Sequence, residues 1–152
     1  MSEIYKLIEA GNPILKVRLS GCSPDLDRDE IERKLINSME HYQGIGLSAN
    51  QIGIMERVFV MYSNINTRET ITCFNPKITT YSKTEIIMDE GCITYPGLWL
   101  KIKRPDGIEV QYEDKTGETQ HLAMFGLECR ISLHEYDHME GMDFTQKVSK
   151  LK

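Results

Sequence analysis

The sequence predicts an α+β fold, in which antiparallel β-sheets pack around a central C-terminal helix and a further helix lies near the N-terminus. Short runs rich in β-branched and aromatic residues, separated by turn residues, fill the middle of the chain. Apolar residues recur at helical spacing before and after these runs. A helix that follows a run of strands packs onto them, and this order gives an α+β fold.

The size and composition indicate a single globular domain spanning residues 1–152. Hydrophobic residues make up 40% of the chain and charged residues 27%, as in soluble proteins. The net charge of −5, with no basic cluster, argues against nucleic-acid binding. No signal peptide or membrane-spanning run is visible, so we expect a cytoplasmic protein. The four cysteines form no CxxC pair, and we expect no disulfides.

The first helix is expected to begin at Ser23 and Pro24, which suit the N-cap and the first helical position. Acidic residues follow, as the dipole of a helix favours near its start. The helical spacing is carried by Ile31, Leu35, Met39 and Tyr42. We expect the helix to end at Gln43-Gly44.

The middle of the chain is expected to form short strands joined by short turns, a pattern typical of antiparallel sheets. Asn75-Pro76 is expected to end the second strand, and residues 114–117 suit a hairpin turn between the last two. The expected strands are 57–62, 70–74, 77–82, 84–88, 98–103, 108–113 and 119–124.

The last helix is expected to cover 126–140, with Gly141 as its C-terminal stop. Leu127 and Ile131 share one stripe of this helix with His134 and His138, at i, i+4, i+7 and i+11. The two histidines therefore continue an apolar face toward the interior. Buried imidazoles that bind a metal fit this position better than solvated rings do.

The segment His134-Glu135-Tyr136-Asp137-His138 indicates a metal site for hydrolysis. Residues at i and i+4 lie on one face of a helix, so His134 and His138 are able to bind one ion. Glu135 can reach a water molecule held by such an ion. The alternative is two solvent-exposed histidines on an ordinary helix, and the pattern alone favours the metal site over it.

A catalytic site of this kind takes three protein ligands and leaves a fourth position for water. Only 14 residues follow His138, and they contain no histidine or cysteine, so the third ligand lies upstream. The candidates are His41, His121, the four cysteines and the acids. Cys92 stands out because it follows an apolar strand and Gly91, which allows close approach. Taken alone, however, a cysteine there is more often a buried core residue.

Three segments together resemble the peptide deformylase family. They are 44–51 (GIGLSANQ), 90–94 (EGCIT) and 134–138 (HEYDH), and their order and spacing also agree with the family. Residues 12–15 resemble the family's opening, so the resemblance covers nearly the whole chain. The chain resembles the compact forms that lack a long C-terminal helix, such as virus-encoded or short bacterial members.

The resemblance implies a metal-dependent hydrolase that removes the N-formyl group from the initiator methionine of new polypeptides and releases formate. It implies Cys92, His134 and His138 as metal ligands, and Glu135 as the general acid–base group. The side-chain amide of Gln51 and the backbone N–H of Ile93 are the expected oxyanion donors. One divalent metal per chain is expected, with Fe²⁺ as the native ion and Zn²⁺, Ni²⁺ or Co²⁺ as substitutes.

An extended peptide is expected to dock on the backbone near Gly46 and Gly91, and an apolar slot to hold the methionine side chain. The expected substrate-binding residues are Ile45, Gly46, Met88, Glu90, Gly91, Leu127 and Ile131. The expected partners are N-formylmethionyl nascent peptides near the ribosome. The protein is expected to be a monomer in a bacterial cytoplasm, including that of a virus-infected host.

The chain departs from the family pattern at a few positions. Ser48 stands for a usual alanine, and Thr94 for a common serine. Trp99 stands where many members carry an arginine, and Arg130 where many carry an apolar residue. These changes bear on the rim of the substrate site rather than on the chemistry.

Two other functions remain open from the sequence. An HExxH-type metallopeptidase would need a third ligand downstream, where none is present. A non-catalytic domain with a structural zinc would need four protein ligands. For that fourth ligand His121 is the one credible candidate, and its strand pattern suggests a surface position.

Overall fold

The computed structural model describes residues 5–148 and confirms the α+β fold, with antiparallel sheets around the C-terminal helix. The helices are α1 (Arg28–His41) and α2 (Gly126–Met139), with short 3-10 turns at Pro13–Lys16, Ala49–Ile52 and Phe144–Gln146. The strands are β1 (Gly46–Ser48), β2 (Val58–Asn64), β3 (Glu69–Tyr81), β4 (Glu85–Cys92), β5 (Tyr95–Pro105), β6 (Gly107–Glu113) and β7 (Thr119–Phe125).

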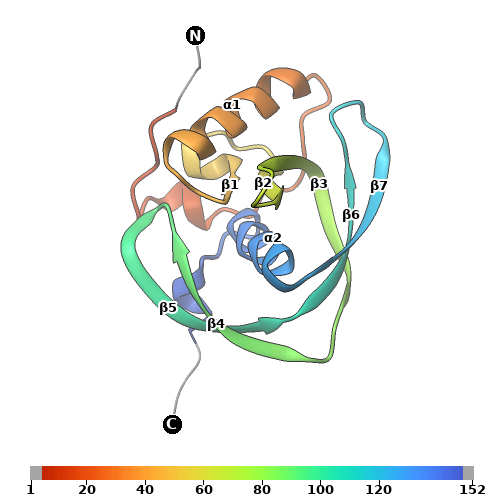
Figure 1. The fold of residues 1–152 in the computed structure, drawn as a ribbon. Helices are drawn as coiled ribbons and strands as arrows, with labels where there is room; N and C mark the ends of the chain where they lie inside the picture. Colours follow the sequence, from red (N-terminus) through yellow and green to blue (C-terminus); the bar gives the residue numbers. More distant parts are fainter. Residues whose placement is uncertain (1–4, 149–152) are drawn as a thin grey trace.

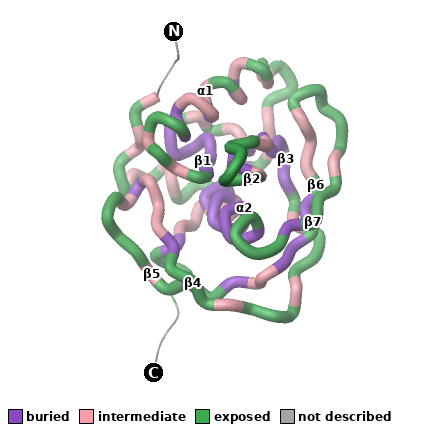
Figure 2. The backbone as a smooth tube through the Cα atoms, in the orientation of Figure 1, coloured by how far each residue is buried: buried purple, intermediate pink, exposed green. Residues whose placement is uncertain are grey.

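The strands form two antiparallel sheets that curve around α2. Five strands pair in the order β1-β2-β3-β6-β7, and β4 pairs with β5 in a separate hairpin. Figure 1 shows α2 in the middle of the molecule, with β4 and β5 beneath it and α1 on the outside of β1 and β2. The sheets thus enclose α2, the helix with the two histidines. Figure 2 shows that much of this helix is buried.

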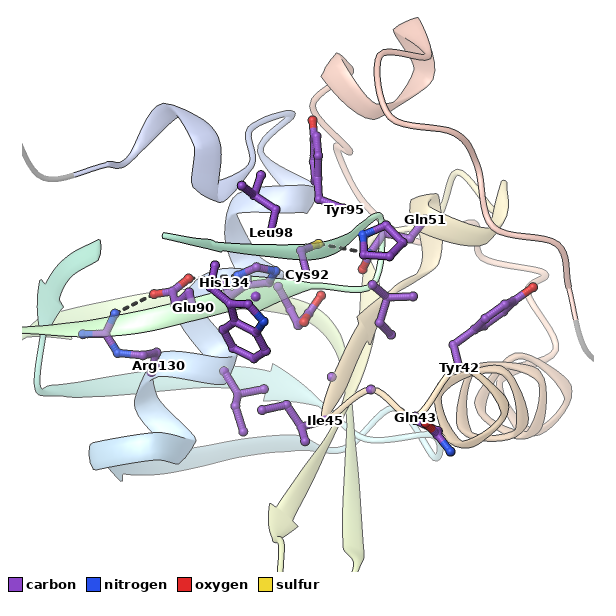
Figure 3. A pocket seen from close by; sticks show the side chains of 18 of the residues that line it. Tyr42, Gln43, Ile45, Gln51, Glu90, Cys92, Tyr95, Leu98, Arg130 and His134 are labelled. Atoms are coloured by element: carbon purple, nitrogen blue, oxygen red, sulfur yellow. Dashed lines mark hydrogen bonds and ion pairs between the residues drawn. The ribbon is translucent and has the colours of Figure 1, made fainter. Parts of the chain in front are cut away.

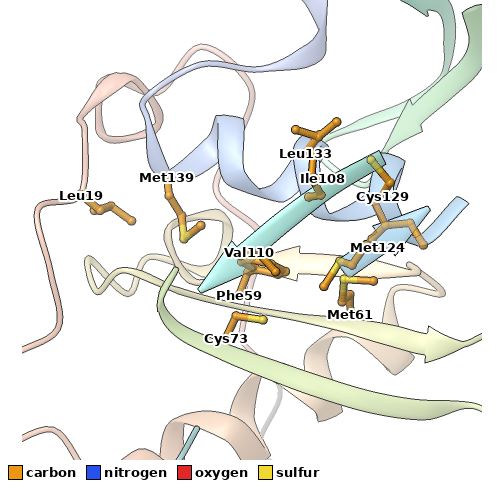
Figure 4. Close-up of a cluster of buried hydrophobic side chains, with 11 residues drawn as sticks. Leu19, Phe59, Met61, Cys73, Ile108, Val110, Met124, Cys129, Leu133 and Met139 are labelled. Carbon is orange, nitrogen blue, oxygen red and sulfur yellow. The ribbon is translucent and has the colours of Figure 1, made fainter. Parts of the chain in front are cut away.

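The two helices cover opposite faces of the five-stranded sheet. Alternate residues of a strand point to opposite faces, and in β2 Phe59 and Met61 join the cluster that contains α2. Val58 and Val60 join the cluster that contains α1. β2 is therefore buried on both faces, which explains its unbroken apolar run. Figure 4 shows the α2 side, where sulfur-bearing side chains fill much of the space between strands and helix.

The expected start of α1 was wrong by several residues, because Asp27 rather than Ser23 caps this helix. The side chain of Asp27 accepts a hydrogen bond from the backbone N–H of Glu30. Ser23 instead donates its N–H and hydroxyl to the carboxylate of Glu56, at 2.8 and 2.6 Å. A tertiary contact with Glu56 thus occupies the side chain of Ser23, which the local sequence had predicted to be the N-cap.

Asn75-Pro76 was expected to end a strand, but it lies inside β3. The pairing of β3 with β6 shifts in register between Phe74 and Lys77, so the strand passes the proline through a bulge. Asn75 has a positive φ of 50°, a conformation that asparagine tolerates better than most residues. The bulge also frees the side chain of Asn75, whose Oδ1 accepts from the N–H of Cys22 at 2.8 Å.

The expected end of α2 is confirmed, because Gly141 follows the helix with φ +77°. A Cβ at this position would also lie 2.5 Å from the backbone oxygen of Lys16. The four cysteines are free, as expected. No helix within residues 5–148 is long and apolar enough to cross a membrane.

Candidate metal centre and active site

The ligand atoms of Cys92, His134 and His138 lie within 4.8 Å of one another. Cys92 ends β4, whereas both histidines project from one face of α2. The Sγ of Cys92 lies 3.4 Å from Nε2 of His138. Within residues 5–148 this is the one group of three such donors close enough to hold a metal ion.

The chemistry of this donor set fits a catalytic metal. A thiolate and two imidazoles suit zinc, iron, cobalt or nickel, and three protein ligands leave a position for water. His121, the candidate for a fourth ligand, is exposed on β7 opposite Gln111 and is not part of the group. The described residues therefore form an open site rather than a closed structural one.

Glu90 orients one of the two histidines. Its Oε1 lies 2.9 Å from Nδ1 of His134, so the Nδ1–H of the imidazole donates to the carboxylate and Nε2 remains for a metal. Burial alone would raise the pKa of Glu90, but hydrogen bonds from His134 and Arg104 outweigh burial and lower this pKa to about 2. Glu90, expected to bind substrate, thus also supports a metal ligand.

Two buried arginines hold Glu90 in place, a role that was not predicted from the sequence. Arg104 on β5 donates Nε to Oε2 at 2.5 Å and Nη2 to Oε1 at 3.0 Å. Arg130 on α2 donates Nη1 to Oε2 at 2.6 Å, and Figure 3 draws this pair beside His134. A signal for Arg104 was available, because it lies two residues after the buried Ile102 and so faces the same side of its strand.

Glu135 is buried beside the metal cluster with one oxygen unpaired. Its Oε1 has no hydrogen-bond partner among residues 5–148. Burial raises the pKa of Glu135 to about 7, which suits a group that takes and returns a proton near neutrality. A Cβ on Gly46 would lie 2.7 Å from its Oε2. The glycine therefore lets β1 pass directly over this carboxylate.

The side-chain amide of Gln51 is held with its nitrogen toward Cys92. The backbone N–H of Ser48 donates to Oε1 of Gln51 at 3.0 Å. Because an N–H can only donate, this contact fixes which end of the amide is oxygen. Nε2 then donates to the hydroxyl of Thr94 at 3.0 Å and lies 3.7 Å from Sγ of Cys92. The amide is preorganised beside the cluster by Ser48 in its own loop and by Thr94 between β4 and β5.

A cavity of about 670 Å³ opens onto the cluster. Glu135, Gln51 and Ile93 line it, together with Gly91 and Arg130. Figure 3 views this cavity, with Cys92 and His134 near the centre, Ile45 below them and Tyr42 to the right. The arrangement joins three metal ligands, a buried acid–base group and an amide donor at one open site.

A family model described as polypeptide deformylase matches residues 4–152. The chain belongs to this family. The peptide deformylase of Prochlorococcus marinus strain MIT 9515 is 33% identical over 97% of this chain and 72% of its own length. The crystal structure of the Thermotoga maritima peptide deformylase has a TM-score of 0.88 at 30% identity, covering 97% of this chain and 99% of that one. A Synechococcus elongatus peptide deformylase in complex with actinonin has a TM-score of 0.91 at 30% identity, covering 96% and 81%.

Most of the expected substrate-binding residues of this deformylase line the cavity, and Met88 does not. The lining residues from that set are Ile45, Gly46, Glu90, Gly91, Leu127 and Ile131. Met88 is 37% exposed on β4 and lies outside the lining. Arg130 binds the residues two positions before and two positions after Met88, with Nη2 on the carbonyl oxygen of Ile86 and Nη1 on Glu90. The guanidinium rather than the methionine thus forms this part of the wall.

Proposed function

We propose that this deformylase, a metal-dependent hydrolase, removes the formyl group from N-formylmethionyl peptides, and that it acts as a monomer on nascent chains in a cytoplasm. The unpaired Oε1 of Glu135 carries the proposal. A buried carboxylate oxygen without a partner is costly unless a ligand or water completes it. Glu135 directly follows the metal ligand His134 along α2 and lines the cavity, where a hydrolytic water and a formyl group would meet.

Cys92, His134 and His138 would hold the metal, and we propose Fe²⁺ as the native ion. A divalent metal bound there supplies a Lewis acid that polarises a carbonyl and lowers the pKa of water. The thiolate and imidazoles also accept zinc, nickel or cobalt. Glu90 keeps Nδ1 of His134 occupied, so that Nε2 is the nitrogen presented to the metal.

Glu135 acts as the general base and then as the general acid. It takes a proton from the attacking water as the new C–O bond forms at the formyl carbon. It then delivers this proton to the amine nitrogen as the C–N bond breaks, leaving formate and a peptide with a free amine. A pKa of about 7 lets one carboxylate perform both transfers.

Gln51 and Ile93 would stabilise the oxyanion of the tetrahedral intermediate. Nε2 of Gln51 faces Cys92, and the backbone of Ile93 directly follows that ligand along the chain. Both residues line the cavity. Preorganised donors of this kind are each worth about 3 kcal/mol of transition-state stabilisation.

The peptide would dock between the edges of β1 and β4. β1 pairs only with β2 and β4 only with β5 in the described part of the chain, so each has an open edge. Gly46 and Gly91 lie on these edges and line the cavity. An extended peptide could add to them through its backbone, while Ile45, Leu127 and Ile131 receive the methionine side chain.

The decisive experiment is formate release from formyl-Met-Ala-Ser by enzyme prepared anaerobically with Fe²⁺, and in parallel with Ni²⁺. We expect release with both metals, and roughly 10²–10⁴-fold slower turnover in Glu135→Gln at unchanged metal content. Unformylated Met-Ala-Ser serves as the control, because its cleavage would indicate a peptidase instead. Absence of formate at one metal per chain would refute the proposed function.

A further inference from the structure

The single tryptophan of the chain, Trp99, lies at the rim of the catalytic cavity. It is 68% exposed on β5 and lines the cavity. Tryptophan is usually largely buried, because its ring carries the largest apolar surface of any side chain. A mostly exposed indole beside a substrate cavity therefore needs an explanation other than core packing.

The indole lies flat against Gly91, directly before the metal ligand Cys92. A Cβ on Gly91 would be 2.9–3.1 Å from three atoms of the six-membered ring, so only glycine allows this contact. The ring covers one side of the β4 edge at which we propose that the peptide docks. A strand advances about 3.3 Å per residue, so the ring is large enough to flank one or two residues of a docked peptide.

The charges around this rim do not favour an acidic side chain. Arg130 is the one arginine or lysine among the described residues that line the cavity, and its guanidinium is bound to Glu90 and to two backbone carbonyls. Asp89 also lines the cavity, and its side chain is 61% exposed beside Lys101. The rim thus offers an aromatic surface and a carboxylate.

We propose that Trp99 is a specificity-determining residue, which contacts the first two residues after the formylmethionine and selects apolar or aromatic side chains over polar and acidic ones. The inference rests on the proposed function and names the preference of that same site. Aromatic contacts of this type favour the matching substrate roughly two- to tenfold. Because these proposed contacts lie beyond the scissile bond, the preference should act on KM more than on kcat.

Fluorescence tests the contact directly, because Trp99 is the only indole in the chain. Zinc-loaded enzyme is titrated with the product-type peptides Met-Phe-Ala, Met-Ser-Ala and Met-Glu-Ala. We expect Met-Phe-Ala to shift the emission to shorter wavelength as the ring leaves water, with a smaller shift for Met-Ser-Ala. Unchanged emission at concentrations where Met-Phe-Ala inhibits formate release would overturn the proposal.

Kinetics test the selection. We compare kcat/KM for formyl-Met-Phe-Ala, formyl-Met-Ala-Phe and formyl-Met-Ser-Ala in the wild type, Trp99→Ala and Trp99→Phe. Trp99→Ala should abolish the aromatic preference, and Trp99→Phe should retain most of it. Tyr81→Ala removes a comparably exposed ring (55%) that does not line the cavity, and should keep the preference.

The two proposals fail in different ways. Formate release from every peptide with the same preference in the wild type and in Trp99→Ala would refute the role of Trp99 and leave the deformylase reaction intact. No formate from any peptide at one metal per chain would refute the reaction itself.

Discussion

Nδ1 of His134 lies 2.9 Å from Oε1 of Glu90, and this contact aims the other ring nitrogen at the metal cluster. The same carboxylate is held by Arg104 from β5 and by Arg130 from α2. Arg130 lies one helical turn before His134, so one face of α2 carries both a metal ligand and a residue that positions its partner. The support of the metal site is thus built into the helix that supplies the ligands.

Arg130→Met should weaken metal binding although it changes no ligand. Loss of the guanidinium leaves Glu90 with Arg104 and His134 as its partners, and supporting residues of this kind typically contribute 10–100-fold to metal affinity. We expect a loss of roughly tenfold, measured by zinc competition with a chromophoric chelator, with altered absorption bands in the cobalt enzyme. Arg28→Met is the control, because Arg28 binds Glu113 and the carbonyl of Asp114 away from the cluster. Equal zinc affinities in both variants would contradict this role.

Cys92→Ala should lose metal, because it removes one of three ligands. The loss of affinity should exceed the roughly 10–100-fold expected for a supporting residue. Cys22→Ala is the matched control, since Cys22 is also partly buried but its Sγ binds the carbonyl of Arg57. Metal content is measured by atomic absorption after dialysis at fixed free zinc. Equal stoichiometry in Cys92→Ala and the wild type would refute the ligand assignment.

Gly46→Ala should reduce turnover while leaving the metal in place. The new Cβ would lie 2.7 Å from Oε2 of Glu135 and 2.8 Å from Cγ2 of Ile131, so the carboxylate has to move. A displacement of about 1 Å at a reacting group can cost on the order of 100-fold. Gly21→Ala is the control, because its Cβ would meet only Asn75, at 3.6 Å. Wild-type kcat in Gly46→Ala would show that Glu135 tolerates the shift.

Gln51→Ala should lower kcat by roughly 100–1,000-fold, the usual cost of losing one oxyanion donor. KM should change little, because the amide acts mainly on charge that develops in the transition state. Metal content should stay at one per chain, since Nε2 of Gln51 is 3.7 Å from Cys92 and donates to Thr94 rather than binding the metal. The test is to measure kcat and KM of Gln51→Ala by steady-state kinetics, with the metal content determined in parallel. An unchanged kcat would remove Gln51 from the mechanism.

Much of the fold could be predicted from local patterns. The span of α2 and the strand at 57–62 follow from the spacing of apolar residues and from the turn residues beside them. The structure confirms both elements. The errors have a common cause. Ser23 does not cap α1 because Glu56 binds it, and Asn75-Pro76 does not end β3 because a bulge absorbs it. In each case a residue distant in sequence decided the outcome.

The sequence by itself determined that two histidines share a helix face with a carboxylate between them, because an i, i+4 spacing is a property of any α-helix. It also indicated most of the strands around that helix, although it did not predict β1 and divided β3 into two strands. Only the tertiary structure decided that Cys92 joins His138 across 46 positions, that two arginines converge on Glu90, and that Trp99 covers Gly91. These contacts depend on how β4, β5 and α2 pack together, and no local period encodes the packing of segments so far apart.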